Sequence, residues 1–119
     1  MSKKTLPPLI SYKQWDIVWV RIQPNDRDQH PAILFSPTEV INKLTRVCVL
    51  YGTTKRPAQD AEEGQILLNG ADGLDHITVF DTALIYMVRK DTITGKIGEV
   101  SYNCRVVLKR KIISVYRLL

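Results

Sequence analysis

Short apolar runs separated by turn-forming residues cover most of this sequence. The runs are four to seven residues long and rich in Val, Ile, Leu and aromatic residues; they lie at 16–22, 32–36, 46–51, 65–68, 77–80 and 83–88. Runs of this length and composition predict strands rather than helices. Because Gly, Pro and Asn separate them, the pattern indicates a small β-barrel or β-sandwich.

The connections between these runs carry their own predictions. Residues 23–31 are dense in turn-forming and charged side chains, which predicts an exposed loop. Gly52 is expected to end the strand at 46–51, and Thr94-Gly95-Lys96 is expected to form a turn before Ile97. Asn69-Gly70 directly follows a strand and is typical of a tight hairpin turn.

The C-terminal segment follows a different period. Its apolar side chains recur at i, i+4, i+7 and i+11, at Leu108, Ile112, Val115 and Leu119. This spacing predicts one face of a helix, for which Ser101 is a suitable N-cap. The β-branched pairs at 106–107 and 112–113 leave a strand as the alternative. The predicted fold class is therefore mainly β, a small barrel with a C-terminal α-helix.

Composition is that of one soluble globular domain. The chain has 119 residues, of which 45% are apolar and 24% charged. We expect residues 1–14 to form a loosely held tail and residues 15–119 to form the single domain. No apolar run is long enough to predict a membrane helix. The two cysteines, Cys48 and Cys104, have no metal or redox spacing, which points to a reducing, cytoplasmic setting.

Positive charge is concentrated near the C-terminus. The formal net charge is +5, and residues 89–119 hold eight cations against two carboxylates, leaving −1 for residues 1–88. A basic segment on a neutral body suggests a polyanion or an acidic protein as partner. A solvated basic face without a partner is an equally good reading of charge alone. A DNA-reading helix is a weaker option, because no helix-turn-helix pair is visible.

Metal or cofactor chemistry has no support in the sequence. His30 and His76 are 46 positions apart, and zinc spacings, Gly-rich phosphate loops and nucleophile elbows are all missing. One segment offers chemistry of another kind, because hydroxyls and cations follow the third strand directly, from Thr53 to Arg56. Hydroxyl, amide and cationic donors together suit a phosphate group. A solvated turn is the alternative interpretation of this segment.

The order of these segments resembles the PemK/MazF-type toxins of toxin–antitoxin modules. The likeness is carried by the strand at 16–20, Pro24, the segment 30–36, the strand end at 47–54, the stretch 73–81, Lys96-Ile97-Gly98 and the terminal helix. It spans residues 15–119. The resemblance implies an SH3-like β-barrel, a homodimer, an acidic antitoxin partner, and metal-independent cleavage of single-stranded RNA through the ribose 2′-OH.

Site residues are carried over position by position. His30 occupies the place of the family's Arg-Pro arginine, and Thr53 and Thr54 match its Thr/Ser pair. Asp81 matches the aspartate of the family's Asp-Gln motif, although Thr82 replaces the glutamine. The resemblance therefore implies catalytic roles for His30, Thr53, Thr54 and Asp81. Nearby cations are predicted to bind RNA, namely Arg27, Lys55, Arg56 and Arg89.

Two functions remain open on the sequence. The first is an endoribonuclease in which His30 transfers protons, Thr53 and Thr54 orient the scissile phosphate, and Arg27 or Lys55 stabilises its charge. The second is a non-catalytic barrel that binds RNA or an acidic protein. The second is favoured by the loss of the family arginine, because imidazole is a weaker and conditional cation.

Overall fold

The structure is a computed structural model, and it describes residues 11–21, 28–54 and 64–117. Its elements, in chain order, are β1 (Asp16–Val20), β2 (His30–Leu34), α1 (Thr38–Lys43), β3 (Arg46–Thr54), β4 (Gln65–Leu68), the 3-10 helix η1 (Gly70–Asp72), β5 (Thr78–Arg89), the 3-10 helix η2 (Lys90–Thr92), β6 (Ile93–Glu99) and α2 (Tyr102–Tyr116). The six strands form one sheet in the order β4-β5-β3-β2-β1-β6.

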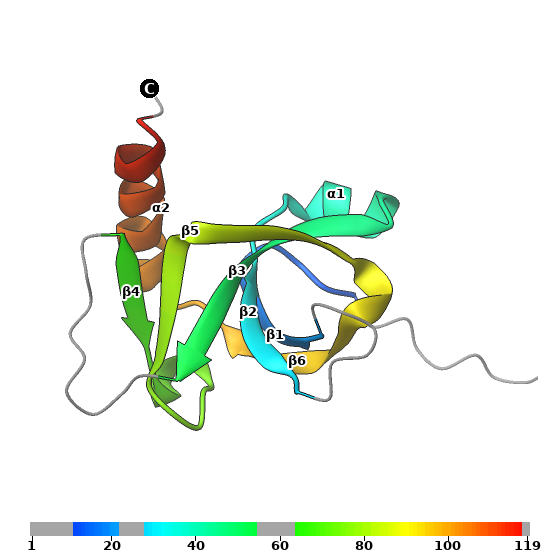
Figure 1. The fold of residues 1–119 in the computed structure, drawn as a ribbon, viewed down its shortest axis with the longest axis horizontal. Coiled ribbons are helices and arrows are strands. Elements are labelled where there is room, and N and C mark those ends of the chain that lie inside the picture. The colour runs from blue at the N-terminus through cyan, green and yellow to red at the C-terminus, as the bar shows by residue number, and fades with distance from the viewer. Residues whose placement is uncertain (1–10, 22–27, 55–63, 118–119) are drawn as a thin grey trace, which may run out of the picture.

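The sheet is antiparallel throughout and curls strongly (Figure 1). Helix α2 packs on β4 and β5, and the short helix α1, which the apolar pattern did not predict, packs on β3. The mainly β fold with a C-terminal helix is confirmed. Among the described residues, no helix has the length and apolar content that crossing a membrane requires.

Strand alternation fills a core on each face of the sheet. In β1, Ile17 belongs to one core, whereas Val18 and Val20 belong to the other. The first core, under α2, consists of Ile17, Ile33, Leu50, Ile66, Leu68, Leu74, Phe80, Val100, Leu108 and Ile112. The second consists of Val18, Val20, Ala32, Leu34, Ile41, Val47, Val49, Val88 and Ile93. Because successive side chains point to opposite faces, the apolar runs predicted as strands bury both faces.

Strand β2 begins earlier than its apolar run predicts. His30 and Pro31, placed in a loop by their composition, pair with Val20 and Trp19 of β1. Pairing with a neighbour therefore extends the strand into turn-forming residues.

The expectation that Gly52 ends a strand is wrong. Strand β3 runs through Gly52 to Thr54. A Cβ on Gly52 would lie 2.6 Å from a ring carbon of Phe80 and 2.9 Å from the carbonyl oxygen of Pro31. Glycine is required here because a ring and a backbone approach it closely, not because the chain turns.

The expected hairpin turn at Asn69-Gly70 is also wrong. Strands β4 and β5 are antiparallel neighbours, but residues 69–77 connect them. Asn69 instead caps η1, and its side-chain Oδ1 accepts a hydrogen bond from the nitrogen of Ala71 at 2.9 Å. Asparagine serves both as a turn residue and as a helix cap, so the dipeptide alone does not separate the two structures.

This connection joins the two edge strands of the sheet. Asp72 lies against Gly98 of β6, where a Cβ would collide with its carbonyl oxygen. The buried carboxylate of Asp72 accepts a hydrogen bond from the nitrogen of Ser101 at 2.9 Å. Residues 69–77 therefore link the β4 edge to β6 and to the start of α2.

Two further strand predictions need correction. Thr94-Gly95-Lys96 is not a turn; it lies within β6, where Gly95 pairs with Trp19 and the register with β1 shifts twice. The runs 77–80 and 83–88 belong to one strand, β5. Between Leu50 and Gly52, β3 advances by two residues while β5 advances by five, so β5 holds three extra residues there. This irregularity bends β5 away from β3.

The C-terminal helix is confirmed. Ser101 is its N-cap and accepts a hydrogen bond from the nitrogen of Cys104. Leu108 and Ile112 are buried, as the period predicts. Val115 is 39% exposed, because the last turns of α2 extend past the sheet (Figure 1). Leu119, the last residue of the predicted face, lies outside the described residues.

Candidate active site

A pocket of about 490 Å³ lies where β2 begins and β3 ends. Its lining comes from β1, from β2 and the residue before it, from β3 and β6, and from β5 with the connection that precedes it: Trp19, Gln29, His30, Pro31, Gly52, Thr53, Leu74, Asp75, His76, Thr78 and Ile97. We call it the site pocket. It brings together His30 and Thr53, two of the residues that the sequence predicted as catalytic.

Strand pairing brings His30 and Thr53 to the same pocket. Ala32 of β2 is the Cα partner of Tyr51 of β3. The pairing of β2 with β3 ends at this pair, and His30 and Thr53 each lie two residues beyond it, where both line the site pocket.

An aromatic contact orients the His30 imidazole. Its ring centroid lies 4.9 Å from that of Tyr51, at an interplanar angle of 45°. Tyr51 in turn meets Tyr86 of β5 edge-on, at 5.8 Å. Offset and edge-on arrangements of this kind are the favourable ones for aromatic rings. The half-buried imidazole is thus packed on one side and open to the pocket on the other.

The pocket contains a second imidazole, which sequence reasoning missed. His76 lies in the connection before β5, and its carbonyl oxygen accepts a hydrogen bond from the Thr78 hydroxyl at 3.0 Å. Thr78 is the β5 partner of Thr54, so the β3–β5 pairing brings His76 to the end of β3. No local signal in the sequence reveals this, because 46 residues separate the two histidines.

The other predicted catalytic residues have different positions. Thr54 is the last residue of β3 and follows Thr53 directly. Asp81 does not line the site pocket. Its Oδ1 accepts a hydrogen bond from the nitrogen of Ala83 at 2.8 Å, and its Oδ2 accepts one from Gln65 Nε2 at 3.3 Å. The bend in β5 turns Asp81 toward β4, so a catalytic role for it stays a prediction.

The predicted RNA-binding cations are not gathered at the site pocket by the described structure. Arg89 ends β5 and pairs with Arg46, seven residues before Thr53 on β3. Arg89 therefore lies at the other end of β3 from Thr53 and does not line the site pocket. Arg27, Lys55 and Arg56 lie outside the described residues.

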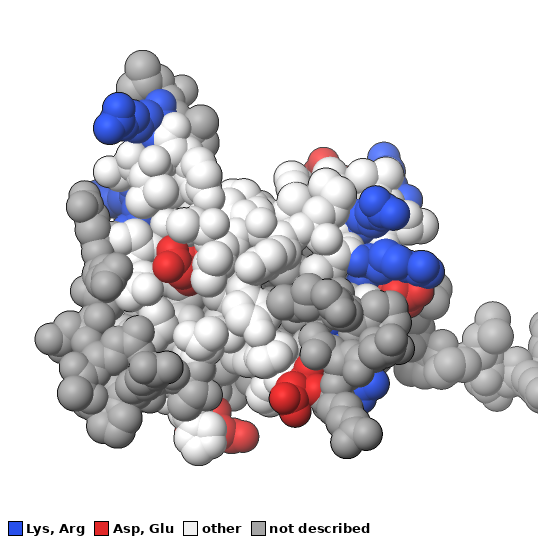
Figure 2. Space-filling model, viewed as in Figure 1, with Lys and Arg blue, Asp and Glu red and all other residues white. Residues whose placement is uncertain are grey.

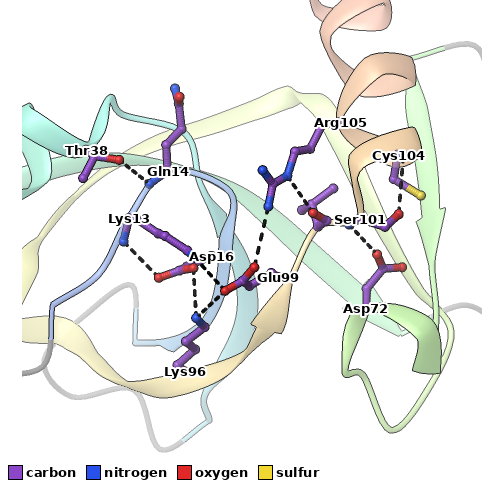
Figure 3. Close-up of polar contacts among 11 residues, drawn as sticks. Lys13, Gln14, Asp16, Thr38, Asp72, Lys96, Glu99, Ser101, Cys104 and Arg105 are labelled. Atoms are coloured by element: carbon purple, nitrogen blue, oxygen red, sulfur yellow. Dashed lines mark hydrogen bonds and ion pairs between the residues drawn. The ribbon is translucent and has the colours of Figure 1, made fainter.

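The densest ion-pair network serves a structural role (Figure 3). Glu99 Oε1 lies 2.8 Å from Lys13 Nζ and 2.9 Å from Lys96 Nζ, and its Oε2 lies 3.7 Å from Arg105 Nη2. Hydrogen bonds from Lys13 and Lys96 lower the pKa of Glu99 to about 2. Lys96 also forms an ion pair with the fully buried Asp16, at 3.2 Å. The network ties β6 to β1 and α2.

Residues just before β1 join the same region. The Lys13 nitrogen donates to Asp16 Oδ2 at 2.9 Å, and Gln14 Nε2 donates to the Phe35 carbonyl at 2.8 Å. The Gln14 nitrogen also donates to the Thr38 hydroxyl at 3.1 Å (Figure 3). Contacts with the sheet therefore begin before residue 15, within the segment predicted as a tail.

Metal-binding donors do not cluster in the described part of the chain. Within residues 11–21, 28–54 and 64–117, no three His, Cys, Asp or Glu side chains are grouped closely enough to hold a metal ion. The chemistry that the site pocket offers is proton transfer by imidazole and hydrogen bonding by hydroxyl and backbone groups.

A family model described as the PemK-like, MazF-like toxin of type II toxin–antitoxin systems matches residues 13–116. The chain belongs to this family. The resemblance inferred from short motifs is therefore confirmed over nearly the whole chain. No curated protein sequence gives a significant match to it.

Solved structures of PemK/MazF-like toxins share the fold at low sequence identity. The Mycobacterium tuberculosis toxin MazF-mt6 is 16% identical, covering 87% of this chain and 98% of that one, with a TM-score of 0.74. A mycobacterial endoribonuclease in complex with its cognate antitoxin is 14% identical, covering 91% and 97%, with a TM-score of 0.76. MazE–MazF (Form-II) from Deinococcus radiodurans is 12% identical, covering 92% and 98%, with a TM-score of 0.70.

Proposed function

We propose that this chain is a metal-independent endoribonuclease toxin that cleaves single-stranded RNA in the cytoplasm as a homodimer. The observation that carries the proposal is that His30 and Thr53, each at its family motif position, line the same pocket. Membership of a toxin family adds weight, and relatives of the same fold include proteins named as endoribonucleases.

The proposed reaction is transesterification at phosphorus. The ribose 2′-oxygen attacks the phosphorus while a base takes its proton, and the P–O5′ bond breaks as an acid protonates the leaving oxygen. The products are a 2′,3′-cyclic phosphate and a 5′-hydroxyl end. Two proton-transfer groups are needed, and His30 and His76 are the two imidazoles of the site pocket. Imidazole is suited to both roles because it exchanges protons near neutral pH.

Thr53 is assigned the role of binding the scissile phosphate. Its exposed hydroxyl at the end of β3 can donate a hydrogen bond to a non-bridging oxygen, and Thr54 continues the same strand end. The predicted cations Arg27, Lys55, Arg56 and Arg89 complete the proposal as RNA-binding groups. DNA would resist cleavage because it lacks the 2′-hydroxyl.

An acidic antitoxin is the proposed protein partner. Structures of relatives include an endoribonuclease in complex with its cognate antitoxin and a MazE–MazF complex from Deinococcus radiodurans. The net charge of +5 on this chain favours an acidic partner. We expect the partner to inhibit cleavage by covering the RNA-binding surface.

The deciding experiment is cleavage of end-labelled single-stranded RNA in EDTA, beside DNA of the same sequence. We expect the wild type to cut only RNA, and His30→Ala, His76→Ala and Thr53→Ala to lose on the order of 10²-fold in rate. Ser114→Ala, which removes an exposed hydroxyl from α2, is the matched control and should cut normally. Intact RNA with the wild type, or full activity in both His30→Ala and Thr53→Ala, would refute the proposal.

One observation favours a non-catalytic RNA-binding module instead. The described lining of the site pocket includes Asp75 but neither Lys nor Arg, so a cation for the transition state is not seen there. A binding module predicts salt-sensitive RNA binding with no strand scission at any enzyme concentration. Scission by the wild type that is lost in Thr53→Ala would exclude this alternative.

A further inference from the structure

A second polar pocket continues along β1 from the site pocket. Trp19 lines the site pocket, and Arg21, two residues further on, lines a pocket of about 340 Å³ together with Arg89, Asp91, Thr92 and Thr94. We call it the arginine pocket. Arg21 follows β1 directly, and its backbone nitrogen donates to the Thr92 carbonyl at 3.2 Å. The Thr94 hydroxyl also donates to the Trp19 carbonyl at 3.5 Å, so the two pockets are neighbours.

Arg21 holds a polar donor without an acceptor. Its Nε is buried and has no hydrogen-bond partner in the described structure. Its backbone nitrogen, in contrast, is held by the Thr92 carbonyl at 3.2 Å. Buried polar atoms are paired in most proteins, and an unpaired one calls for an explanation such as a ligand. A guanidinium is suited above all to the oxygens of a phosphate or carboxylate.

Near Arg21, the pocket linings contain more cationic side chains than carboxylates. Arg89 also lines a third pocket, of about 430 Å³, together with Tyr12, Lys43 and Lys90. Over the arginine pocket and this third pocket, one carboxylate, Asp91, faces the four cations Arg21, Lys43, Arg89 and Lys90. Figure 2 shows Lys and Arg gathered near α1 and the end of β5.

Strand pairing adds a further repulsion at this end of the sheet. Arg46 of β3 and Arg89 of β5 are direct Cα partners. Like charges at such positions destabilise a sheet. The ion pair between Arg89 and Asp91, at 2.6 Å, offsets only one of these two charges. An arrangement that costs stability is expected where it serves binding.

We propose that the arginine pocket binds a phosphate of the RNA strand next to the cleavage site, with Arg21 as its main ligand. The proposal rests on the endoribonuclease function and adds a subsite to it. In this proposal the RNA strand continues past Arg89 over Lys43 and Lys90. There the Tyr12 ring offers a stacking surface for a base. RNA fits better than an acidic peptide because cations and an aromatic ring in adjacent pockets match alternating phosphates and bases.

The first test measures binding without cleavage. The probe is a single-stranded RNA of about twelve nucleotides with 2′-O-methyl groups throughout, titrated over a range of salt concentrations. We expect Arg21→Gln to bind roughly tenfold more weakly and to lower the log–log salt slope by about 0.7. Arg110→Gln removes the same charge from α2, which lines none of the three pockets, and should bind like the wild type. Equal losses in both variants would overturn the proposal.

A second measurement separates this proposal from the function on which it rests. With cleavable RNA, Arg21→Gln should raise KM by a larger factor than it lowers kcat, because the arginine pocket holds a neighbouring phosphate and not the phosphate that reacts. Normal cleavage and binding by Arg21→Gln would overturn the subsite alone. A wild type that binds but never cuts would refute the proposed function, while the Arg21→Gln effect on binding would still support an RNA phosphate site.

Two controls complete the design. The melting temperature of Arg21→Gln should stay close to that of the wild type, because the buried Nε has no hydrogen bond to lose in the described structure. If Arg21→Gln is unfolded to an extent that accounts for its weaker RNA binding, the proposal is contradicted. If Arg21→Gln weakens binding of polyglutamate but leaves RNA binding unchanged, the pocket serves an acidic protein and the RNA proposal is wrong.

Discussion

Gly98 of β6 lies directly beneath the backbone carbonyl of Asp72, so close that a Cβ on Gly98 would overlap the carbonyl oxygen. The contact closes the gap between the β4–β5 connection and the opposite edge strand. The same connection carries Asp75 and His76 to the site pocket. The close backbone approach at Gly98 therefore helps to hold the connection that places the second imidazole.

Replacing Gly98 by alanine should destabilise the fold. The new methyl group meets a backbone carbonyl, which cannot turn aside like a flexible side chain, so we expect a cost of about 1–3 kcal/mol in unfolding free energy. Gly95→Ala in the same strand is the control, because no atom lies within 4 Å of its added Cβ. Urea denaturation measures both variants. Equal stability of Gly98→Ala and Gly95→Ala would show that the contact is not tight.

Removing the Asp72 side chain should weaken the same junction. Its carboxylate is buried and accepts hydrogen bonds from the nitrogens of Ser101, at 2.9 Å, and Asn69, at 3.4 Å. We expect Asp72→Ala to lower the unfolding free energy by about 1–3 kcal/mol, because the Ser101 donor loses its acceptor.

The control for Asp72 is Asp91→Ala, which breaks an exposed ion pair with Arg89 and should cost less than about 1 kcal/mol. Thermal melts of both variants decide the comparison. A smaller loss in Asp72→Ala than in Asp91→Ala would contradict the role given to Asp72.

Local composition predicted the strands β1 to β5 and the terminal helix, but not β6, because β-branched runs and a 3.6-residue period act over short distances. It failed where a neighbouring segment decides the conformation. Gly52 stays in a strand because it pairs with Phe80 of β5, whose ring leaves no space for a side chain at this position. Gly95 stays in β6 because Trp19 pairs with it. Neither neighbour is near in sequence.

Only part of the candidate site was predictable, because some of its residues are brought together by contacts that are distant in sequence. His30 and Thr53 occupy recognisable motif positions, and the antiparallel neighbours β2 and β3 bring both to the site pocket. His76 reaches the site pocket through the β3–β5 pairing and the 69–77 connection, which no local pattern encodes. The unpaired Nε of Arg21 is likewise a property of packing, not of residue order.

Acid should destabilise the fold through Glu99. The ordinary carboxyl pKa of 4.5 is lowered to about 2 by hydrogen bonds from Lys13 and Lys96. The folded state therefore binds fewer protons than the unfolded state in this range, and stability is lost as the pH falls from about 4.5 to about 2. We expect Glu99→Gln to be less stable than the wild type at pH 7 and to lose less stability across that window.

The measurement for Glu99 is the unfolding free energy from denaturant titrations at closely spaced pH values. Glu39→Gln makes the same substitution at an exposed position on α1 and should keep the wild-type acid profile. An unchanged acid profile in Glu99→Gln would refute the assignment.

Substitution of Asp81 tests whether this residue has a structural role or a catalytic one. Its carboxylate accepts hydrogen bonds from the Ala83 nitrogen and from Gln65 Nε2, and it does not line the site pocket. We therefore expect Asp81→Ala to lower the unfolding free energy by about 0.5–1.5 kcal/mol and to keep kcat, per folded molecule, within a few-fold of the wild type. Thr53→Ala, measured beside it, should show the opposite pattern, with stability kept and kcat reduced on the order of 10²-fold. Circular dichroism melts and single-turnover cleavage provide the two readouts. A 10²-fold fall in kcat for Asp81→Ala with an unchanged melting temperature would instead establish the catalytic role that the family motif implies.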